Sequence, residues 1–242
     1  MRDEKELKLE KFKELVLFYN EKFNLTAIKD DKEFYAKHFE DSLLPSKSVD
    51  FNNKKIMDIG SGAGFPGIPL AIYFPNSSFY LVEPTTKRAN FLEIVKNELN
   101  LENVFVINKR VEDLKKDNSY KDFDLVVSRA VSELVILLEL SIPYLKVGGK
   151  LVAYKGLNYE EEIKRSENAL KTLKCDIDFI QKEKLSLNDE TRFNIIIKKE
   201  GVTPSIYPRN FGAIKKRPLL WQKLLQLIIK REELEKQQLQ LI

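Results

Sequence analysis

Hydrophobic residues in the first fifty positions of the chain recur at helical spacing. Residues 4–23 place them three and four positions apart with charged residues between, and residues 32–44 continue this pattern up to Pro45. No run typical of a strand precedes residue 54. The pattern therefore predicts a helical N-terminal cap over residues 1–52.

From residue 55 onward, short apolar runs typical of buried strands alternate with amphipathic stretches typical of helices. The expected strands are 55–59, 78–83, 104–108, 123–129 and 150–155, with a closing pair at 175–185 and 192–200. The expected helices are 69–74, 87–100, 133–145 and 159–173. Such alternation predicts an α/β fold in which helices cover both faces of a mostly parallel, seven-stranded sheet.

Length and composition fit a single domain. The 242 residues are 43% hydrophobic, which suffices for one sizeable core. We expect this domain to comprise the cap, a core over residues 53–200, and a basic tail with an extra helix over residues 201–242.

The composition argues against several classes of protein. Cys175 and His38 are the only residues of their types, so we expect neither a disulfide framework nor a metal site. The charged N-terminus is unlike a signal peptide, and no run approaches the ~18 apolar residues of a membrane span. We therefore expect a cytoplasmic protein with no membrane partner.

Basic residues gather toward the C-terminal end, although the net charge is only +4. Residues 191–231 contain ten lysines and arginines against one acid, Glu200. The ten are Arg192, Lys198, Lys199, Arg209, Lys215, Lys216, Arg217, Lys223, Lys230 and Arg231. Clustered cations attract phosphate, so this segment is predicted to grip RNA together with Lys87, Arg88 and Arg110. The alternative is the solvated surface of a lysine-rich protein.

The loop after the first expected strand carries two overlapping glycine patterns. Gly62, Gly64 and Gly67 spell G-x-G-x-x-G, the dinucleotide-binding fingerprint. Starting from Gly60, the glycines instead spell G-x-G-x-G behind an acid, Asp58. The identity of the bound nucleotide depends on which glycine begins the motif.

Two residues favour S-adenosylmethionine over a dinucleotide. Counted from Gly60, which directly follows the strand, the third glycine position is occupied by the bulky Phe65. Asp58 at the strand end would repel a pyrophosphate but suits a cationic ligand, and S-adenosylmethionine carries an ammonium and a sulfonium. Glu83 ends the second strand and can accept hydrogen bonds from ribose hydroxyls with either ligand. The sequence predicts cofactor contacts at Asp58, Gly60, Gly62, Gly64 and Glu83.

Longer stretches of the chain resemble the RsmG (GidB) family of methyltransferases. They are residues 20–28 with 38–43, 58–72, 127–134 with 153–156, and 207–219. The most specific parts are the Phe-Pro-Gly-Ile-Pro run after the glycines and the Tyr-Pro-Arg of the tail. The resemblance implies a class I S-adenosylmethionine-dependent methyltransferase fold, Rossmann-like, with S-adenosyl-L-methionine as cofactor. It also implies methylation of guanine N7 in the 530 loop of small-subunit (16S) ribosomal RNA, either naked or within the 30S particle.

The resemblance also implies individual site residues. It implies cofactor contacts at Gly60, Phe65, Glu83, Val111, Glu112 and Arg129. It points to Lys87, Arg88, Arg110, Lys155 and Arg192 as RNA or active-site cations, to which we add His38 and Arg209 as candidate RNA contacts.

The implied reaction needs little acid–base chemistry, because guanine N7 has no proton to lose. The sequence accordingly holds no constellation of nucleophile, base and acid. The remaining task is to align an unstacked base with the methyl donor. Arg129 and Lys155, at the ends of the fourth and fifth expected strands, are predicted to do this. We expect Arg129 to bind the cofactor carboxylate. The alternatives are donation to guanine O6 and a pair with a neighbouring acid. We expect Lys155 to bind phosphate or guanine O6.

One departure from the family pattern is the segment 220–242, which extends past the usual end and looks like an extra amphipathic helix. Helix packing or self-association is its expected role, and the oligomeric state stays open. Three other functions stay open as well: a class I methyltransferase for another RNA, a protein or a small molecule; an NAD-binding oxidoreductase; and a non-catalytic RNA-binding factor.

Overall fold

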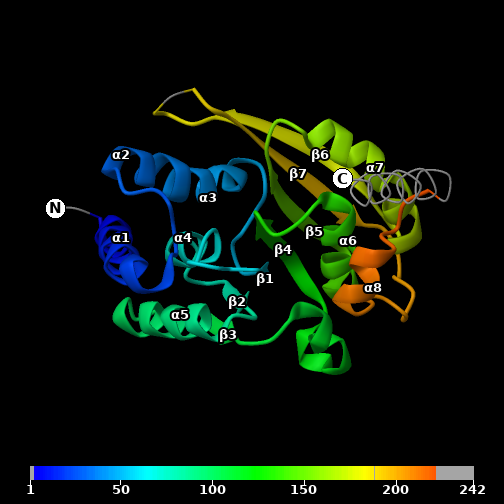
Figure 1. Ribbon diagram of the computed structural model, residues 1–242, viewed down its shortest axis with the longest axis horizontal. Coiled ribbons are helices and arrows are strands. Elements are labelled where there is room, and N and C mark those ends of the chain that lie inside the picture. Colours follow the sequence, from blue (N-terminus) through cyan, green and yellow to red (C-terminus); the bar gives the residue numbers. More distant parts are fainter. Residues whose placement is uncertain (1–2, 188, 222–242) are drawn as a thin grey trace, which may run out of the picture.

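A computed structural model describes residues 3–187 and 189–221 of the chain, in which a twisted central sheet separates two sets of helices (Figure 1). Its strands are β1 (Lys55–Ile59), β2 (Ser78–Val82), β3 (Val104–Ile107), β4 (Phe123–Arg129), β5 (Leu145–Lys155), β6 (Cys175–Lys184) and β7 (Thr191–Lys199). Within the described residues these form one seven-stranded sheet in the order β3-β2-β1-β4-β5-β7-β6. The predicted α/β fold is confirmed.

Five strands of the sheet run parallel and two do not. β1 pairs in parallel with β2 and β4, and the parallel part continues to β3 on one side and β5 on the other. β7 lies antiparallel between β5 and β6. Because the parallel strands all end at the same edge, the loops that follow them meet there.

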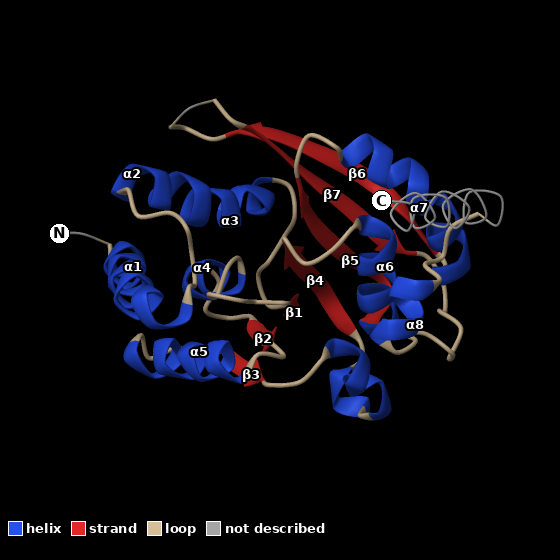
Figure 2. Ribbon diagram, in the orientation of Figure 1, coloured by secondary structure: helices blue, strands red, loops and turns tan. Residues whose placement is uncertain are grey.

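Helices cover the two faces of the sheet (Figure 2). One face carries α1 (Glu4–Phe23), α4 (Gly67–Tyr73) and α5 (Thr86–Glu98), and the other carries α6 (Leu134–Ser141), α7 (Tyr159–Leu173) and α8 (Phe211–Lys216). Consecutive strand residues point to opposite faces, so Ile56 packs in the first core and its neighbour Met57 in the second. No described helix has the length and apolar character that crossing a membrane requires.

The second helical segment of the cap is less regular than its sequence pattern. Where one helix is expected over 32–44, the backbone passes from α2 (Asp31–Phe34) through a π-helical turn at Tyr35–Glu40 into α3 (Asp41–Leu43). Phe34 and Phe39 are both buried on the core side of this segment. A π-helical turn shifts the residues after it around the helix axis, and here it precedes the buried carboxylate of Asp41.

Other boundaries also differ from expectation. β5 begins at Leu145 rather than at 150, and the preceding helix α6 ends at Ser141, where a 3₁₀ turn containing Pro143 follows. Proline lacks the N–H that a continued helix would need. The sequence analysis did not identify the short helix α8. The extra helix expected over 220–242 lies almost entirely outside the described residues.

The last glycine of the loop after β1 is required by a close approach of side chains. A Cβ atom at Gly67 would lie 2.6 Å from Oδ2 of Asp58 and 2.4 Å from Cδ2 of Leu81. The Gly67 N–H donates to the same Asp58 oxygen over 3.1 Å. Gly67 therefore completes the apparent dinucleotide fingerprint for a packing reason, since it lets α4 close onto β1.

We expect Gly67→Ala to lower the free energy of unfolding by about 1–3 kcal/mol, because the added methyl group overpacks the contact with Asp58. Denaturant unfolding measures this change. Gly212→Ala is the matched control: its Cβ would meet nothing closer than 3.6 Å, so its stability should stay at or slightly above that of the wild type. Equal stability of the two variants would contradict the packing explanation.

Candidate functional site

Two cavities adjoin at the carboxyl ends of the parallel strands. The smaller, of about 140 Å³, lies between the ends of β1 and β2 and the segment after β3, and we call it the small cavity. The larger, of about 500 Å³, lies beyond the ends of β4 and β5, and we call it the large cavity. Val131, in the loop after β4, lines both. The cavities are therefore neighbours that share one side chain as a wall.

The first glycine of the loop, Gly60, lines the small cavity, and Gly62 follows it two positions later. Gly60 and Gly62 have φ angles of +72° and +55°, a region that side chains other than glycine rarely adopt. A Cβ at Gly60 would lie 2.4 Å from Cγ2 of Val131. The loop after β4 can thus close onto the glycine loop only because Gly60 has no side chain.

Glu83 places a fixed carboxylate at the end of β2. Its side chain is buried, with 3% of the residue exposed, and its two oxygens accept hydrogen bonds from the backbone N–H groups of Gly62 and Thr85 over 2.9 and 2.8 Å. Each carboxylate oxygen has a second lone pair. Glu83 therefore ties the glycine loop to β2 while keeping acceptor capacity for a ligand.

Asp58 lies deeper than the sequence analysis expected. The residue is 0% exposed, its Oδ2 accepts from Gly67, and its Oδ1 has no hydrogen-bond partner. Burial raises the pKa of this carboxyl to about 7, an effect that hydrogen bonding and the positive charge of Arg129 only partly oppose. Asp58 thus supports the glycine loop from beneath, and direct contact with a ligand stays a prediction.

The small cavity has mostly apolar walls. Val82, Val111, Leu140 and Phe211 line it, and Arg110 and Glu112 also contribute polar side chains. The Arg110 guanidinium lies 5.8 Å from the centroid of the Phe211 ring. Sequence reasoning found Val111 and Glu112 but missed Leu140 and Phe211, because only the folded chain brings α6 and α8 to the end of β3.

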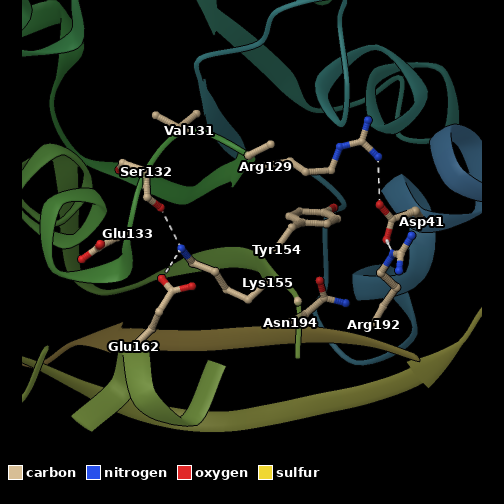
Figure 3. A pocket seen from close by; sticks show the side chains of 12 residues that line it. Asp41, Arg129, Val131, Ser132, Glu133, Tyr154, Lys155, Glu162, Arg192 and Asn194 are labelled. Carbon is tan, nitrogen blue, oxygen red and sulfur yellow. Dashed lines mark hydrogen bonds and ion pairs between the residues drawn. The ribbon is translucent and has the colours of Figure 1, made fainter. Parts of the chain in front are cut away.

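The large cavity contains a bridge between two guanidinium groups (Figure 3). Asp41 of the cap is 5% exposed, and its carboxylate contacts Nη1 of Arg129 at 2.8 Å and Nε of Arg192 at 3.2 Å. Arg192 also pairs with Glu190. The alternative considered for Arg129, a pair with a neighbouring acid, is the arrangement that the structure shows.

Lys155 lines the same cavity at the end of β5 (Figure 3). Its ammonium contacts Glu162 Oε2 at 2.6 Å and donates to the backbone oxygen of Ser132 at 2.8 Å. Glu162 also accepts from the N–H of Leu134 at 2.7 Å. Glu162 therefore holds the Lys155 ammonium in place beside the loop after β4.

His38 lies in the π-helical turn of the cap, and its imidazole is neutral. Arg129 can only donate, so Nδ1 of His38 accepts from it at 3.2 Å, and Nε2–H donates to Thr26 Oγ1 at 2.8 Å. Burial, reinforced by the positive Arg129, lowers the pKa of His38 to about 3. The imidazole stacks on Phe65 with the ring centroids 4.3 Å apart. These contacts give His38 a structural role, because it fixes Arg129, which lines the large cavity.

Phe65, a predicted cofactor contact, lies within an aromatic cluster. The residue is 6% exposed, and its ring packs against those of Phe12, Phe34 and Phe39 as well as His38. The phenylalanine that displaces the third fingerprint glycine thus fastens the cap to the glycine loop. Its contact with a cofactor stays a prediction.

The predicted RNA-binding cations lie in different environments. Lys87 and Arg110 are exposed, and Arg88 is half-buried in the first turn of α5. Arg209 differs from them: its guanidinium forms a bidentate pair with the buried Glu139, at 2.8 and 2.6 Å. This geometry gives Arg209 the task of anchoring the tail to α6 and leaves little of its charge available to RNA.

The charges around the large cavity balance. Three cations line it, and so do three carboxylates: Arg129, Lys155 and Arg192 against Asp41, Glu133 and Glu162. Among residues 3–187 and 189–221, no group of three or more His, Cys, Asp or Glu side chains lies close enough together to hold a metal ion. The site is therefore suited to a polar ligand of low charge.

Sequence comparison connects the chain to one family. The GidB family model, described as rRNA small subunit methyltransferase G, matches residues 5–189. Proteins named ribosomal RNA small subunit methyltransferase G are among its relatives. The one from Streptococcus gordonii is 41% identical over 223 residues, covering 90% of this chain and 92% of the relative. The one from Thermoanaerobacter sp. is 45% identical over 212 residues, covering 87% and 88%.

Solved structures share the fold at low sequence identity. TYW2 from M. jannaschii, determined in complex with AdoMet, aligns with a TM-score of 0.54 at 17% identity, covering 72% of this chain and 79% of TYW2. A putative O-methyltransferase from Klebsiella pneumoniae aligns with a TM-score of 0.55 at 10% identity, covering 78% and 90%. At these identities the likeness concerns the fold alone.

The buried Asp58 carboxyl should make stability depend on pH. Its folded-state pKa of about 7 lies above the ordinary value of 3.8, so the native state keeps a proton that the unfolded chain releases between these values. This contribution to stability is full below about pH 4 and is lost as the pH rises to about 7. Between pH 5 and 8 we expect the free energy of unfolding of the wild type to fall by about 2–3 kcal/mol relative to that of Asp58→Asn, because the asparagine amide does not titrate.

Denaturant unfolding of both proteins across this pH range measures the difference, in which the titration of all other groups cancels. Parallel stability profiles for wild type and Asp58→Asn would show that the carboxyl is ionised throughout and would contradict the raised pKa.

Proposed function

The chain belongs to the rRNA small subunit methyltransferase G (GidB) family, and from this membership we propose that it methylates guanine N7 in small-subunit ribosomal RNA. The reaction class, the cofactor S-adenosyl-L-methionine and the 16S ribosomal RNA substrate follow from the family. The guanine, its N7 atom and the role of each residue are the finer parts of the proposal.

The residues at the ends of β1, β2 and β3 fit S-adenosylmethionine. Glu83 offers fixed acceptor oxygens for ribose hydroxyls, and the apolar small cavity beside Val111 and Glu112 suits an adenine ring. Gly60 and Gly62 have no Cβ atoms, so no side chain of these two residues blocks the space beside the loop. We assign these five residues to the cofactor, which supplies an electrophilic methyl group on a sulfonium.

The neutral balance of the large cavity supports a nucleobase as its occupant. A phosphate would favour a surplus of cations, whereas Lys155 and Arg192 are each matched by a carboxylate. Guanine presents an O6 acceptor beside N7, so a donor at the end of β5 can orient the base edge. We assign this task to the Lys155 ammonium, which Glu162 holds in place.

Arg129 and Asp41 define the far side of the same cavity. Because Asp41 already occupies Nη1 of Arg129 and His38 contacts its Nη2, the guanidinium is held in one orientation. We propose that Arg129 positions the reactants from this fixed arrangement. No group in this network has to accept a proton, and a neutral His38 bonded on both nitrogens agrees with a reaction that needs no general base.

Exposed and half-buried cations near the two cavities would bind the RNA backbone. Lys87 and Arg88 begin α5, just past the end of β2, and Arg110 lies at the small cavity. Non-specific affinity for RNA comes mainly from such phosphate contacts. The observation that carries the proposal is the family membership, and the two adjoining cavities support it because they offer neighbouring places for a methyl donor and a base.

The decisive experiment maps the methyl group. The protein is incubated with labelled S-adenosylmethionine and small-subunit particles that lack the modification, and in parallel with the naked RNA. We expect one methyl group on guanine N7, detected as a reduction- and aniline-sensitive cleavage site in the RNA chain. Label on another atom, on a different RNA or on neither substrate would contradict the proposed function.

Lys155→Met should lower kcat/KM for methylation by about 10²-fold or more, because positioning groups contribute on this scale. Binding of S-adenosylhomocysteine, measured by calorimetry, should be unchanged. Lys146→Met is the matched control, since Lys146 pairs with Asp124 at the start of β5, away from both cavities. Normal methylation by Lys155→Met, or an equal loss in the control, would contradict the assigned role.

A further inference from the structure

A third cavity, of about 360 Å³, lies at the opposite end of the parallel strands. It is bounded by the starts of β4 and β5, the end of β7 and the segment 202–208 of the tail, and we call it the tail cavity. Its lining residues are Lys115, Lys121, Pro143, Tyr144, Lys199, Val202, Thr203, Ser205, Tyr207 and Pro208. None of them lines the small or the large cavity, so the tail cavity is a separate place on the molecule.

The charge of the tail cavity is not balanced. Three lysines line it and no carboxylate does, in contrast to the large cavity, which three cations and three carboxylates line. Lys115, Lys121 and Lys199 form no ion pair within the described part of the chain, whereas Lys198, next to Lys199, pairs with Glu200 at 3.0 Å. The tail cavity therefore concentrates positive charge that no described carboxylate neutralises at contact distance.

Lys199 is the most constrained of the three. The residue is 6% exposed, and its Nζ donates to the backbone oxygen of Leu145 over 2.6 Å. An ammonium has three N–H donors, and this bond uses one. Burial lowers the pKa of Lys199, and the nearby Asp122 opposes the effect only in part. A buried ammonium without a charged partner is costly, and a bound anion would offset that cost.

Lys115 is hydrogen-bonded to the tail. Its Nζ donates to the backbone oxygens of Ile206 and Pro208 over 2.9 and 3.3 Å, which ties it to the segment that bounds the cavity. These acceptors orient the ammonium without cancelling its charge. Tyr144 and Tyr207 add ring surfaces to the lining. The cavity thus combines three lysines with aromatic and apolar lining residues, and its volume exceeds that of a single phosphate ion.

We propose that the tail cavity binds the phosphoryl group of a phosphate ester through Lys115, Lys121 and Lys199. The group has two possible sources with the same chemistry: a free phosphorylated small molecule, or a backbone phosphate of RNA. Lysine ammonium groups on three separate segments suit the several oxygens of one phosphoryl group.

Inorganic phosphate is the first probe, applied to the full-length protein. We expect phosphate to raise Tm by about 3–6 °C at ten times its dissociation constant, relative to sodium chloride at the same ionic strength. Lys199→Met should abolish this rise while keeping or raising Tm in chloride, since it removes a buried charge but retains an apolar stem. Lys198→Met, the matched control on the same strand, should keep the full rise.

Lys121→Met provides a second test that does not disturb the interior, because Lys121 is exposed. It should weaken phosphate binding several-fold at unchanged Tm in chloride. A phosphate effect no larger than that of chloride would overturn the proposal. The proposal would also be overturned if Lys199→Met had a lower Tm in both salts and still showed the full rise of Tm with phosphate, because Lys199 would then have only a structural role.

Measurements of RNA binding distinguish the two possible sources of the phosphoryl group. If RNA supplies it, Lys121→Met and Lys199→Met should bind small-subunit ribosomal RNA more weakly, with the slope of log K against log salt reduced by about 1 each. If a free phosphate ester supplies it, RNA affinity stays at the wild-type value, and a nucleoside monophosphate reproduces the Tm rise. Methyl transfer is measured separately, so failure of the tail cavity and failure of the proposed function are distinguishable.

Discussion

The carboxylate of Asp41 connects three parts of the chain that are far apart in sequence. It contacts Arg129 at the end of the parallel strand β4 and Arg192 on the antiparallel strand β7, while its own backbone belongs to the N-terminal cap. Removing one partner of such a buried arrangement leaves uncompensated charge, which is strongly destabilising. The Asp41 carboxylate therefore joins the cap, the parallel half of the sheet and the antiparallel half at one point, which is a wall of the large cavity.

Electrostatics differ between the two ends of the sheet for a related reason. At the carboxyl ends, each arginine or lysine of the large cavity is paired with a carboxylate, so the cavity is polar but nearly neutral. At the opposite end, Lys199 is buried with a backbone carbonyl as its hydrogen-bond acceptor. The first arrangement holds the charged side chains in fixed positions, whereas the second leaves the charge of a buried ammonium without a paired carboxylate. One domain thus carries two kinds of polar cavity that its net charge of +4 does not distinguish.

Sequence patterns predicted the local structure better than the site. The strands 55–59 and 123–129 and the helix 159–173 have the predicted bounds, because each has a clear hydrophobic period and a distinct end. Of the acid at the strand end and the glycines after it, Gly60 lines the small cavity, and the binding of a ligand by these residues stays a prediction.

Residues with long-range partners were predicted less well. Arg209 was predicted to contact RNA, yet its guanidinium pairs with Glu139, which lies seventy positions earlier in the chain and is completely buried. Asp41, Val131 and Phe211 lie within the stretches that resemble the family, but they were not predicted as site residues, since their contacts arise only when cap, sheet and tail come together.

The order of the strands also has a consequence for synthesis. β7 lies between β5 and β6 although it follows both in the sequence, so β6 leaves the ribosome before its pairing partner exists. Arg192 of the large cavity belongs to β7, and Phe211 of the small cavity follows in α8. The large cavity therefore stays incomplete in the nascent chain until β7 has been translated, and the small cavity until Phe211 has been translated.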